Sequence, residues 1–280
     1  MFLRHHVHRL IALVGLATFA AAPAAAQLHV YGPGGPAPAM KEAAAVFQRQ
    51  TGVAVTVTSG PTPEWIERAR KDADIIYSGS DTMMTDFVRQ LPDSLRQQDV
   101  RPLYDRPAAI LVRKGNPKRV NGFRDLARPG LRVMVVEGAG QNGLWEDLAS
   151  RAGGISFHRA LRPNIVLFAK TSADARAAWI EDKEIDAWVI WNIWQIENAA
   201  LADQVRIEHD ILIWRPMAIA VTTSTKHRDS AARFAAFLEG SEGARIFRRH
   251  GWRGPEPVSG RASLNDQNVN VRDGAGGGRN

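Results

Sequence analysis

Asp74-Ile75-Ile76-Tyr77-Ser78-Gly79-Ser80 is a short apolar run that ends in small residues, and an amphipathic segment, Asp81–Gln90, follows it directly. An apolar run of this length bounded by turn residues is typical of a buried strand, and serine is a preferred residue just before a helix. The stretch therefore predicts a strand that passes through a tight loop into a helix. Repeated units of this kind are typical of α/β proteins whose parallel sheets are covered by helices.

The same alternation continues on both sides of this stretch, from Leu28 to about Trp252. We predict strands at Leu28–Tyr31, Val53–Thr58, Asp74–Tyr77, Ala108–Val112, Arg132–Val136, Ile165–Ala169, Ala187–Trp191, Val205–His209 and Met217–Thr222. We predict helices at Ala37–Gln50, Pro63–Lys71, Asp81–Gln90, Asn142–Arg151, Ser172–Glu181, Ile193–Ala202, His227–Leu238 and Ser241–His250. Thr62, Ser80, Ser172 and Ser241 are expected to cap the helices that follow them.

The first 26 residues have the organisation of a secretory signal peptide. Arg4 and Arg9 make the start basic, Leu10–Ala22 is apolar, and small residues precede a cleavage site after Ala26. The apolar run is shorter than the roughly 20 residues that a membrane-spanning helix needs. We therefore expect export through the Sec route, cleavage near Ala26 and a periplasmic location, in preference to a retained membrane anchor.

The composition excludes several classes of function. The chain has no cysteine, which rules out disulfides, thiol nucleophiles, thiolate metal sites and a lipid-anchoring cysteine. Loss of Arg4 and Arg9 would leave 34 basic against 29 acidic residues, a mild positive charge that favours an anionic ligand. The basic residues are scattered and not interleaved with aromatic residues, so we expect no nucleic-acid partner. The tail 253–280 lacks apolar periodicity and is predicted to be disordered.

Small residues gather where predicted strands end and helices begin. Ligands of open α/β sheets bind at such strand ends. Free backbone N–H groups and the helix dipole make these positions attractive to anions. The clusters are Tyr31-Gly32-Pro33-Gly34-Gly35-Pro36, Thr58-Ser59-Gly60-Pro61-Thr62, Tyr77-Ser78-Gly79-Ser80, Gly138-Ala139-Gly140-Gln141-Asn142 and Trp191-Asn192. Their glycines match neither the dinucleotide nor the nucleotide fingerprint, so we expect no nucleotide cofactor.

The candidate ligand-binding residues follow from these clusters. Trp191 is included because it ends a strand in which alternation places Trp188 on the opposite face. The full set is Tyr31, Gly32, Gly34, Gly35, Ser59, Gly60, Tyr77, Ser78, Gly79, Ser80, Arg106, Gly138, Ala139, Gly140, Gln141, Trp191 and Asn192.

The chain shows no convincing catalytic constellation. Ser78 follows a strand but lacks the Gly-x-Ser-x-Gly elbow and an evident histidine partner. The histidines beyond the first 26 residues do not have metal-ligand spacing. The acidic residues Glu181, Asp182 and Glu184 are interpreted as a solvated loop. We expect no catalytic residue, no metal and no cofactor.

At these residues the chain resembles the type II periplasmic solute-binding proteins. Within them it resembles the accessory colonisation factor C group, relatives of the sulfate- and molybdate-binding proteins of ABC importers. The segments that carry the resemblance are Val30–Ala39, Ser59–Trp65, Ile76–Ser80, Gly138–Asp147 and Ile190–Trp194. The resemblance implies a monomer of two lobes joined by crossing strands, 28–107 with 218–252 and 108–217, which close over a ligand.

The resemblance also implies how the ligand is held. In oxyanion-binding relatives, serine hydroxyls and helix-start amides bind the ligand, which Ser59, Ser78 and Ser80 could match here. Molybdate binders commonly have a small hydroxyl residue after the first strand, where this chain has Tyr31-Gly32-Pro33. That difference leaves room for a larger anion such as a carboxylate. Arg106 precedes the predicted crossover and either reaches the cleft, favouring a carboxylate or sulfonate, or pairs with Asp105 on the surface.

The expected function is capture of a small anion in the interlobe cleft and its delivery to an ABC importer. The anion would be a sulfate- or molybdate-like oxyanion or a small organic acid. An alternative is a ligand-binding accessory protein for chemotaxis or colonisation, whose partner would be a chemoreceptor instead of a permease. An enzyme on the same fold is a third alternative.

Overall fold

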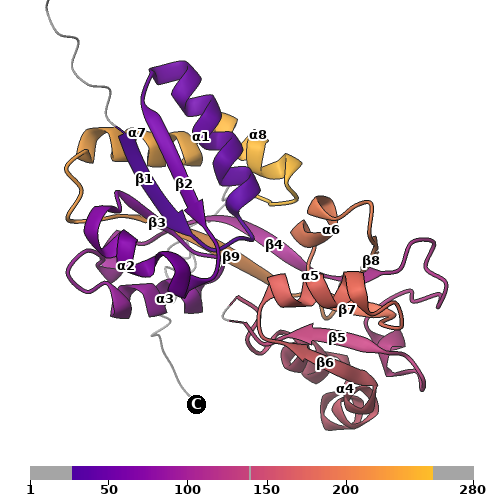
Figure 1. The fold of residues 1–280 in the computed structure, drawn as a ribbon. Helices are drawn as coiled ribbons and strands as arrows, with labels where there is room; N and C mark the ends of the chain where they lie inside the picture. Colours follow the sequence, from indigo (N-terminus) through magenta and orange to yellow (C-terminus); the bar gives the residue numbers. More distant parts are fainter. Residues whose placement is uncertain (1–26, 139, 255–280) are drawn as a thin grey trace, which may run out of the picture.

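The computed structural model describes residues 27–138 and 140–254. It has two α/β bodies joined by two long strands, β4 (Arg101–Val112) and β9 (Trp214–Val221) (Figure 1). The expected signal peptide, and the expected disordered tail apart from Arg253 and Gly254, lie outside the described residues. No helix in the described part of the chain is both long enough and apolar enough to cross a membrane.

The first body has helices on both faces of a sheet. Its strands are β1 (Gln27–Gly32), β2 (Ala54–Ser59) and β3 (Ile75–Tyr77), in the order β2-β1-β3-β9-β4. Its helices are α1 (Ala37–Thr51), α2 (Thr62–Asp72), α3 (Asp81–Gln90), α7 (Arg228–Glu239) and α8 (Ser241–Arg249). Alternation divides the core: Val30 and Ile75 pack with α1, α7 and α8, whereas Tyr31 and Ile76 pack with α2 and α3.

The second body continues the sheet on the other side of β4. Its strands are β5 (Val133–Val136), β6 (Ile165–Ala169), β7 (Ala187–Trp191) and β8 (Asp203–Arg206). The order is β4-β7-β5-β6, and β8 pairs with β4. Its helices are α4 (Leu144–Leu161), α5 (Ser172–Glu181) and α6 (Ile193–Glu197), with short 3₁₀ turns at Arg124–Ala127 and Arg162–Asn164.

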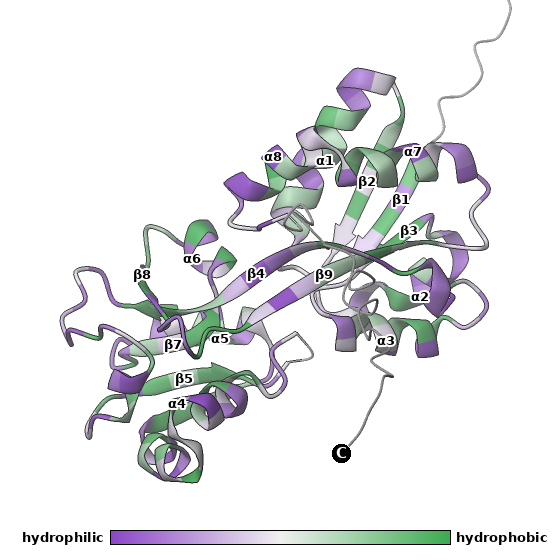
Figure 2. Ribbon diagram, turned by 180° about the vertical axis from the view of Figure 1, so that it is seen from behind, coloured by the Kyte–Doolittle hydropathy of each residue, from purple (hydrophilic) through white to green (hydrophobic). Residues whose placement is uncertain are grey.

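Strand β4 changes partners as it passes between the bodies. Arg101–Pro107 pairs with β9, and Ala108–Val112 pairs with β7 and β8. All pairings of β4 and β9 are antiparallel, whereas the outer pairs β1–β2, β1–β3, β5–β6 and β5–β7 are parallel. Figure 2 shows polar residues interrupting both strands where they pass between the bodies.

The predicted elements correspond closely to the observed ones, with differences at several boundaries. β8 spans Asp203–Arg206 in place of Val205–His209, and β9 begins at Trp214 in place of Met217. β4 begins at Arg101, not at Ala108, because its pairing with β9 extends through a polar segment that breaks the apolar run. α4 continues beyond Arg151 to Leu161, with non-helical backbone at Gly153 and Gly154. α6 ends at Glu197, before the predicted Ala202.

The predicted helix caps are confirmed at one position and wrong at three. Ser80 Oγ accepts the Met83 N–H at 3.2 Å, as a capping serine should. Thr62, Ser172 and Ser241 are instead the first helical residues. For α5 the cap is Thr171, whose hydroxyl accepts the Asp174 N–H at 3.0 Å.

The two bodies also meet away from the connecting strands. The His250 ring lies between two carboxylates, with Nε2 2.7 Å from Glu42 of α1 and Nδ1 3.2 Å from Glu197 of α6. The Asn192 side chain, at the end of β7, donates to the Gly251 carbonyl at 2.7 Å. These contacts hold the second body against the end of α8.

A substitution at Gly32 tests how closely the end of β1 packs against Tyr77. A Cβ at this position would lie 2.5 Å from two ring carbons and from the carbonyl oxygen of the fully buried Tyr77. We expect Gly32→Ala to lower the free energy of unfolding by about 1–3 kcal/mol, measured by urea denaturation. Gly34→Ala, where a Cβ meets nothing within 4 Å, is the control and should change stability by less than about 0.5 kcal/mol. Equal stability of the two variants would contradict this account.

Candidate functional site

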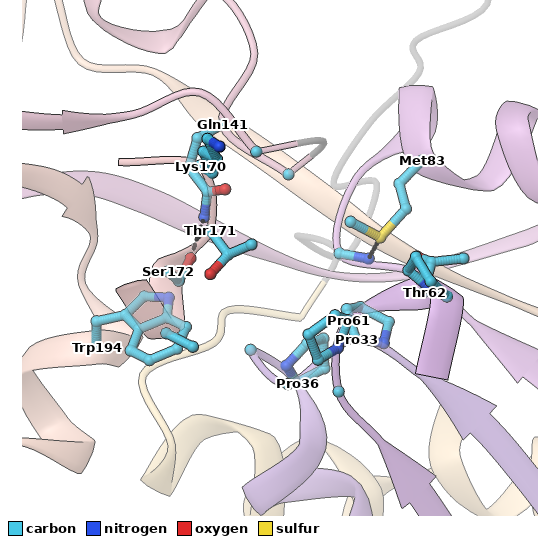
Figure 3. A pocket seen from close by; sticks show the side chains of 18 of the residues that line it. Pro33, Pro36, Pro61, Thr62, Met83, Gln141, Lys170, Thr171, Ser172 and Trp194 are labelled. Carbon is cyan, nitrogen blue, oxygen red and sulfur yellow. Dashed lines mark hydrogen bonds between the residues drawn. The ribbon is translucent and has the colours of Figure 1, made fainter. Parts of the chain in front are cut away.

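A cavity of about 300 Å³ lies between the two bodies (Figure 3). Its walls are loops that follow a strand and precede a helix, so the carboxyl ends of strands from both bodies converge on it. The first body contributes Pro33–Pro36, Gly60–Pro63, Gly79 and Met83. The second contributes Gly138, Gly140, Gln141, Lys170–Ala173 and Trp194, and the connecting strand β4 contributes Arg106.

Arg106 is a buried cation that has no counter-charge among the described residues. Its side chain lines the cavity although the residue is only 2% exposed. Nη2 donates to the Gly79 carbonyl at 2.5 Å, while Nε and Nη1 have no hydrogen-bond partner among the described residues. The guanidinium carbon lies 4.8 Å from the ring centre of Trp191 and 4.7 Å from that of Trp252. The alternative of a surface pair with Asp105 does not occur in this structure.

The surroundings of Arg106 disfavour its charge. Arg215 is its direct neighbour across the β4–β9 pairing, an arrangement of like charges that destabilises a sheet. Burial, and secondarily Arg215, lowers the pKa of Arg106 to about 9. The guanidinium therefore remains charged at neutral pH. Arg215 has partners of its own, donating to the Asn142 carbonyl at 3.0 Å and pairing with Asp147 at 3.3 Å.

Both backbone polar groups of Gly79 form hydrogen bonds with side chains that line the cavity. Its carbonyl accepts from Arg106, and its N–H donates to the Met83 sulfur at 3.3 Å. Met83 is in the first turn of α3 and is 8% exposed. Figure 3 shows this N–H···S bond on the first-body side of the cavity.

The second-body wall is held together by hydrogen bonds between its loops. The Gln141 side chain donates to Ser172 Oγ at 3.1 Å, which joins the loop after β5 to the start of α5. Trp191 Nε1 donates to the Gly140 carbonyl at 3.0 Å. Lys170 is exposed, lines the cavity and has no hydrogen bond or ion pair in the described part of the chain. The wall therefore combines a cation with the N-terminus of a helix.

The structure places about half of the predicted site residues in the cavity lining. These are Gly34, Gly35, Gly60, Gly79, Arg106, Gly138, Gly140 and Gln141. Ala139 lies outside the described residues. Most of the lining set are glycines, as expected of loops whose backbone approaches the cavity closely.

Four other predicted residues contact the strands, helices and loops around the cavity. The Tyr31 hydroxyl donates to Asp72 at 2.8 Å, and burial together with this bond raises the pKa of Tyr31 to about 12. Ser78 Oγ accepts the Ala218 N–H of β9, and Ser80 Oγ caps α3. Trp191 lies against Arg106 and holds Gly140.

The remaining predicted residues lie in packed surroundings. Tyr77 is fully buried against Gly32, and burial raises the pKa of its hydroxyl, an effect that Ser59 opposes in part. The Asn192 amide binds the Gly251 carbonyl. None of the residues in these two groups is among those that line the cavity.

The sequence prediction missed Lys170-Thr171-Ser172 and Met83. The first follows the strand Ile165–Ala169 and precedes a helix, the same order as in the five clusters, but it contains no glycine. Extending the search to every strand–helix junction would have found it. Met83 has no comparable signal, because a methionine in the first turn of a helix is indistinguishable from a core residue.

Comparisons with known proteins place the chain among binding proteins. The model of a family described as bacterial extracellular solute-binding protein matches residues 28–253. None of the curated proteins matches the chain. A crystal structure of L-phospholactate-bound PEB3 is 35% identical, with a TM-score of 0.76, and covers 81% of this chain and 100% of its own. A crystal structure of PEB3 from Campylobacter jejuni is also 35% identical, with a TM-score of 0.75, and covers 81% of this chain and 100% of its own.

Two more distant structures share the fold. The sulfate-binding protein SubI from Mycobacterium tuberculosis is 18% identical, with a TM-score of 0.70, and covers 83% of this chain and 88% of its own. The substrate-binding domain of a putative molybdenum ABC transporter from Clostridium difficile is 17% identical, with a TM-score of 0.64, and covers 83% and 100%. The type II periplasmic binding fold predicted from the sequence is confirmed.

Replacing Arg106 should stabilise the ligand-free protein. A buried charge without a counter-charge is costly, and an apolar side chain of similar length removes that cost. We expect Arg106→Met to raise the free energy of unfolding by about 1–4 kcal/mol, measured by urea denaturation without added anions. Arg89→Met is the control, since Arg89 is exposed, forms a surface ion pair with Asp86, and its loss should change stability by less than about 0.5 kcal/mol. A less stable Arg106→Met variant would contradict this account.

Proposed function

The chain belongs to the bacterial extracellular solute-binding proteins, and on that basis we propose that it captures a small anion in the cavity between its two bodies. Members of this family are carriers and not enzymes, in agreement with the expectation that the chain has no catalytic function. In this proposal 28–107 with 218–252 forms one lobe, 108–217 forms the other, and the lobes close over the ligand.

Arg106 is the observation that carries the proposal. A guanidinium that is 2% exposed and has two nitrogens without partners in the described part of the chain is costly to bury. An anion would accept hydrogen bonds from those nitrogens and neutralise the charge. Hydrogen bonds between ions of opposite charge are roughly twice as strong as neutral ones. An anion in the cavity should therefore bind more tightly than a neutral solute of the same size.

The second-body wall supports a second anionic contact. Thr171 satisfies the Asp174 N–H, which leaves the backbone N–H groups of Ser172 and Ala173 at the positive end of α5. Lys170 adds a cation without a partner in the described structure. An anion with two acidic groups could thus contact Arg106 with one and the start of α5 with the other.

We infer that the ligand is a small organic acid with two acidic groups. PEB3, 35% identical over 81% of this chain, has been crystallised with L-phospholactate, which carries a phosphate and a carboxylate. Arg106 and Lys170 provide two separate cationic contacts for such a molecule, with the backbone amides of Gly34, Gly138 and Gly140 as further donors. The sulfate- and molybdate-binding structures share only the fold with this chain, and bare oxyanions are the second ligand class in the proposal.

The proposed partner is the permease of an ABC importer, reached in the periplasm after removal of the signal peptide. The fold is shared with the substrate-binding domain of a putative molybdenum ABC transporter, which supports this assignment. Co-purification of the ligand-bound protein with inner-membrane proteins separates the two candidate partners. Recovery of a permease supports import, whereas recovery of a chemoreceptor supports the sensory alternative.

Anion binding should raise the melting temperature by mass action, because the ligand binds the native protein and not the unfolded chain. We expect L-phospholactate to give the largest shift in a thermal-shift panel that includes lactate, phosphate, sulfate and molybdate. Arg106→Met should abolish every shift. If no anion stabilises the wild-type protein at millimolar concentration, the proposed function is wrong.

Lys170 should distinguish ligands with two acidic groups from those with one. We expect Lys170→Gln to weaken L-phospholactate binding about 10-fold, as lost charge-assisted contacts do, and phosphate binding by less than about 3-fold, measured by calorimetry. Lys41→Gln is the matched control, because Lys41 is an exposed lysine on α1 that does not line the cavity. Equal losses for the two ligands would show that Lys170 does not contact the second acidic group.

A further inference from the structure

The Met83 side chain lies among polar groups at the cavity wall. It is 8% exposed, lines the cavity wall and accepts the Gly79 N–H through its sulfur at 3.3 Å. A Cβ on Gly140 of the second body would lie 3.6 Å from the Met83 methyl carbon and 3.8 Å from Arg106 Nη2. The thioether therefore lies in the same small volume as the buried guanidinium, and it extends from the first body towards the loop after β5.

A thioether is a poor partner for a buried peptide N–H. Sulfur is a weak acceptor, so this hydrogen bond offsets only part of the free energy lost when the Gly79 N–H is removed from water. An anionic oxygen would accept the same N–H much more strongly. The Met83 backbone is fixed by the Ser80 cap, whereas its unbranched side chain has several rotatable bonds and can leave without disturbing the helix.

We propose that the Met83 thioether is a built-in substitute for a ligand oxygen, which an anion displaces from the Gly79 N–H when it binds. The inference rests on the proposed anion capture and adds a residue that sets its affinity. The acceptor strength of the side chain at position 83 controls binding, because that side chain competes with the ligand for one donor. A weaker acceptor favours the ligand, and a stronger one excludes it.

Two substitutions change acceptor strength in opposite directions. Leucine has a similar volume and no acceptor, so Met83→Leu leaves the Gly79 N–H unsatisfied until an anion binds. Glutamine is similar in length and has an amide oxygen that accepts the N–H better than sulfur does. With L-phospholactate and sulfate as probes in calorimetry, we expect Met83→Leu to bind about 3- to 10-fold more tightly and Met83→Gln about 3- to 10-fold more weakly than wild type.

Met84→Leu is the matched control. Met84 is the next residue of α3, is 1% exposed in the core between α2 and α3, and does not line the cavity. It should bind both probes with wild-type affinity. The Gly79 amide resonance provides an independent readout, since it should move on anion binding in wild type and Met83→Leu and much less in Met83→Gln.

The outcomes separate the inference from the function on which it rests. Tighter binding by the leucine variant together with weaker binding by the glutamine variant supports it. Equal weakening of both variants, or wild-type affinity in both, shows that Met83 only packs, while anion capture stands. A wild-type protein that binds neither probe, and none of the panel, overturns the proposed function and this inference together.

Discussion

The constraint that organises the candidate site is one charged side chain, Arg106, kept out of water at the junction of the two bodies. Arg106 is carried by β4, the strand that pairs with β9 on one side of Pro107 and with β7 on the other. The ring centres of Trp191, at the end of β7, and Trp252, after α8, lie 4.8 Å and 4.7 Å from its guanidinium carbon. The charge thus contacts aromatic rings from both bodies. Cation–π contacts offset part of its desolvation, but they supply no acceptor for its remaining N–H groups.

Topology explains why so many donors meet at this charge. In each body the parallel strands end on the same side of the sheet, and the antiparallel pairing of β4 and β9 brings those two sides face to face. Loops after β1, β2, β3, β5 and β6 therefore line one cavity although they are spread over more than 130 residues. The glycines in these loops expose the backbone, and hydrogen bonds such as that from Trp191 Nε1 to the Gly140 carbonyl fix its position.

The sequence predicted the elements well because most strands are buried on both faces and end at small residues. The predicted start of β4 was Ala108 instead of Arg101. The missed part of the strand crosses between the bodies and is partly polar, at Asp105 and Arg106. Within the site, glycines were predicted better than hydroxyl residues. A glycine loop at a strand end approaches the cavity whatever its register, whereas the direction of Tyr31 or Ser78 depends on which face of the sheet it occupies. That face is decided by strand pairing, which one sequence does not specify.

The contacts between the two bodies determine how a bound anion would affect their relative placement. An anion favours one relative placement only through contacts that differ between placements. His250 and Asn192 already connect the bodies at the end of α8, with the His250 ring between Glu42 and Glu197. These contacts hold one edge together. On the cavity side, two nitrogens of Arg106 have no hydrogen-bond partner among the described residues, the Gly79 N–H donates to sulfur, and the Thr171 cap satisfies the Asp174 N–H at the start of α5. The proposed anion, in contact with both Arg106 and the start of α5, would add contacts between the bodies on the cavity side. In the proposed function these contacts form only while the two bodies lie close together, so we propose that the same hydrogen bonds couple binding to interlobe closure.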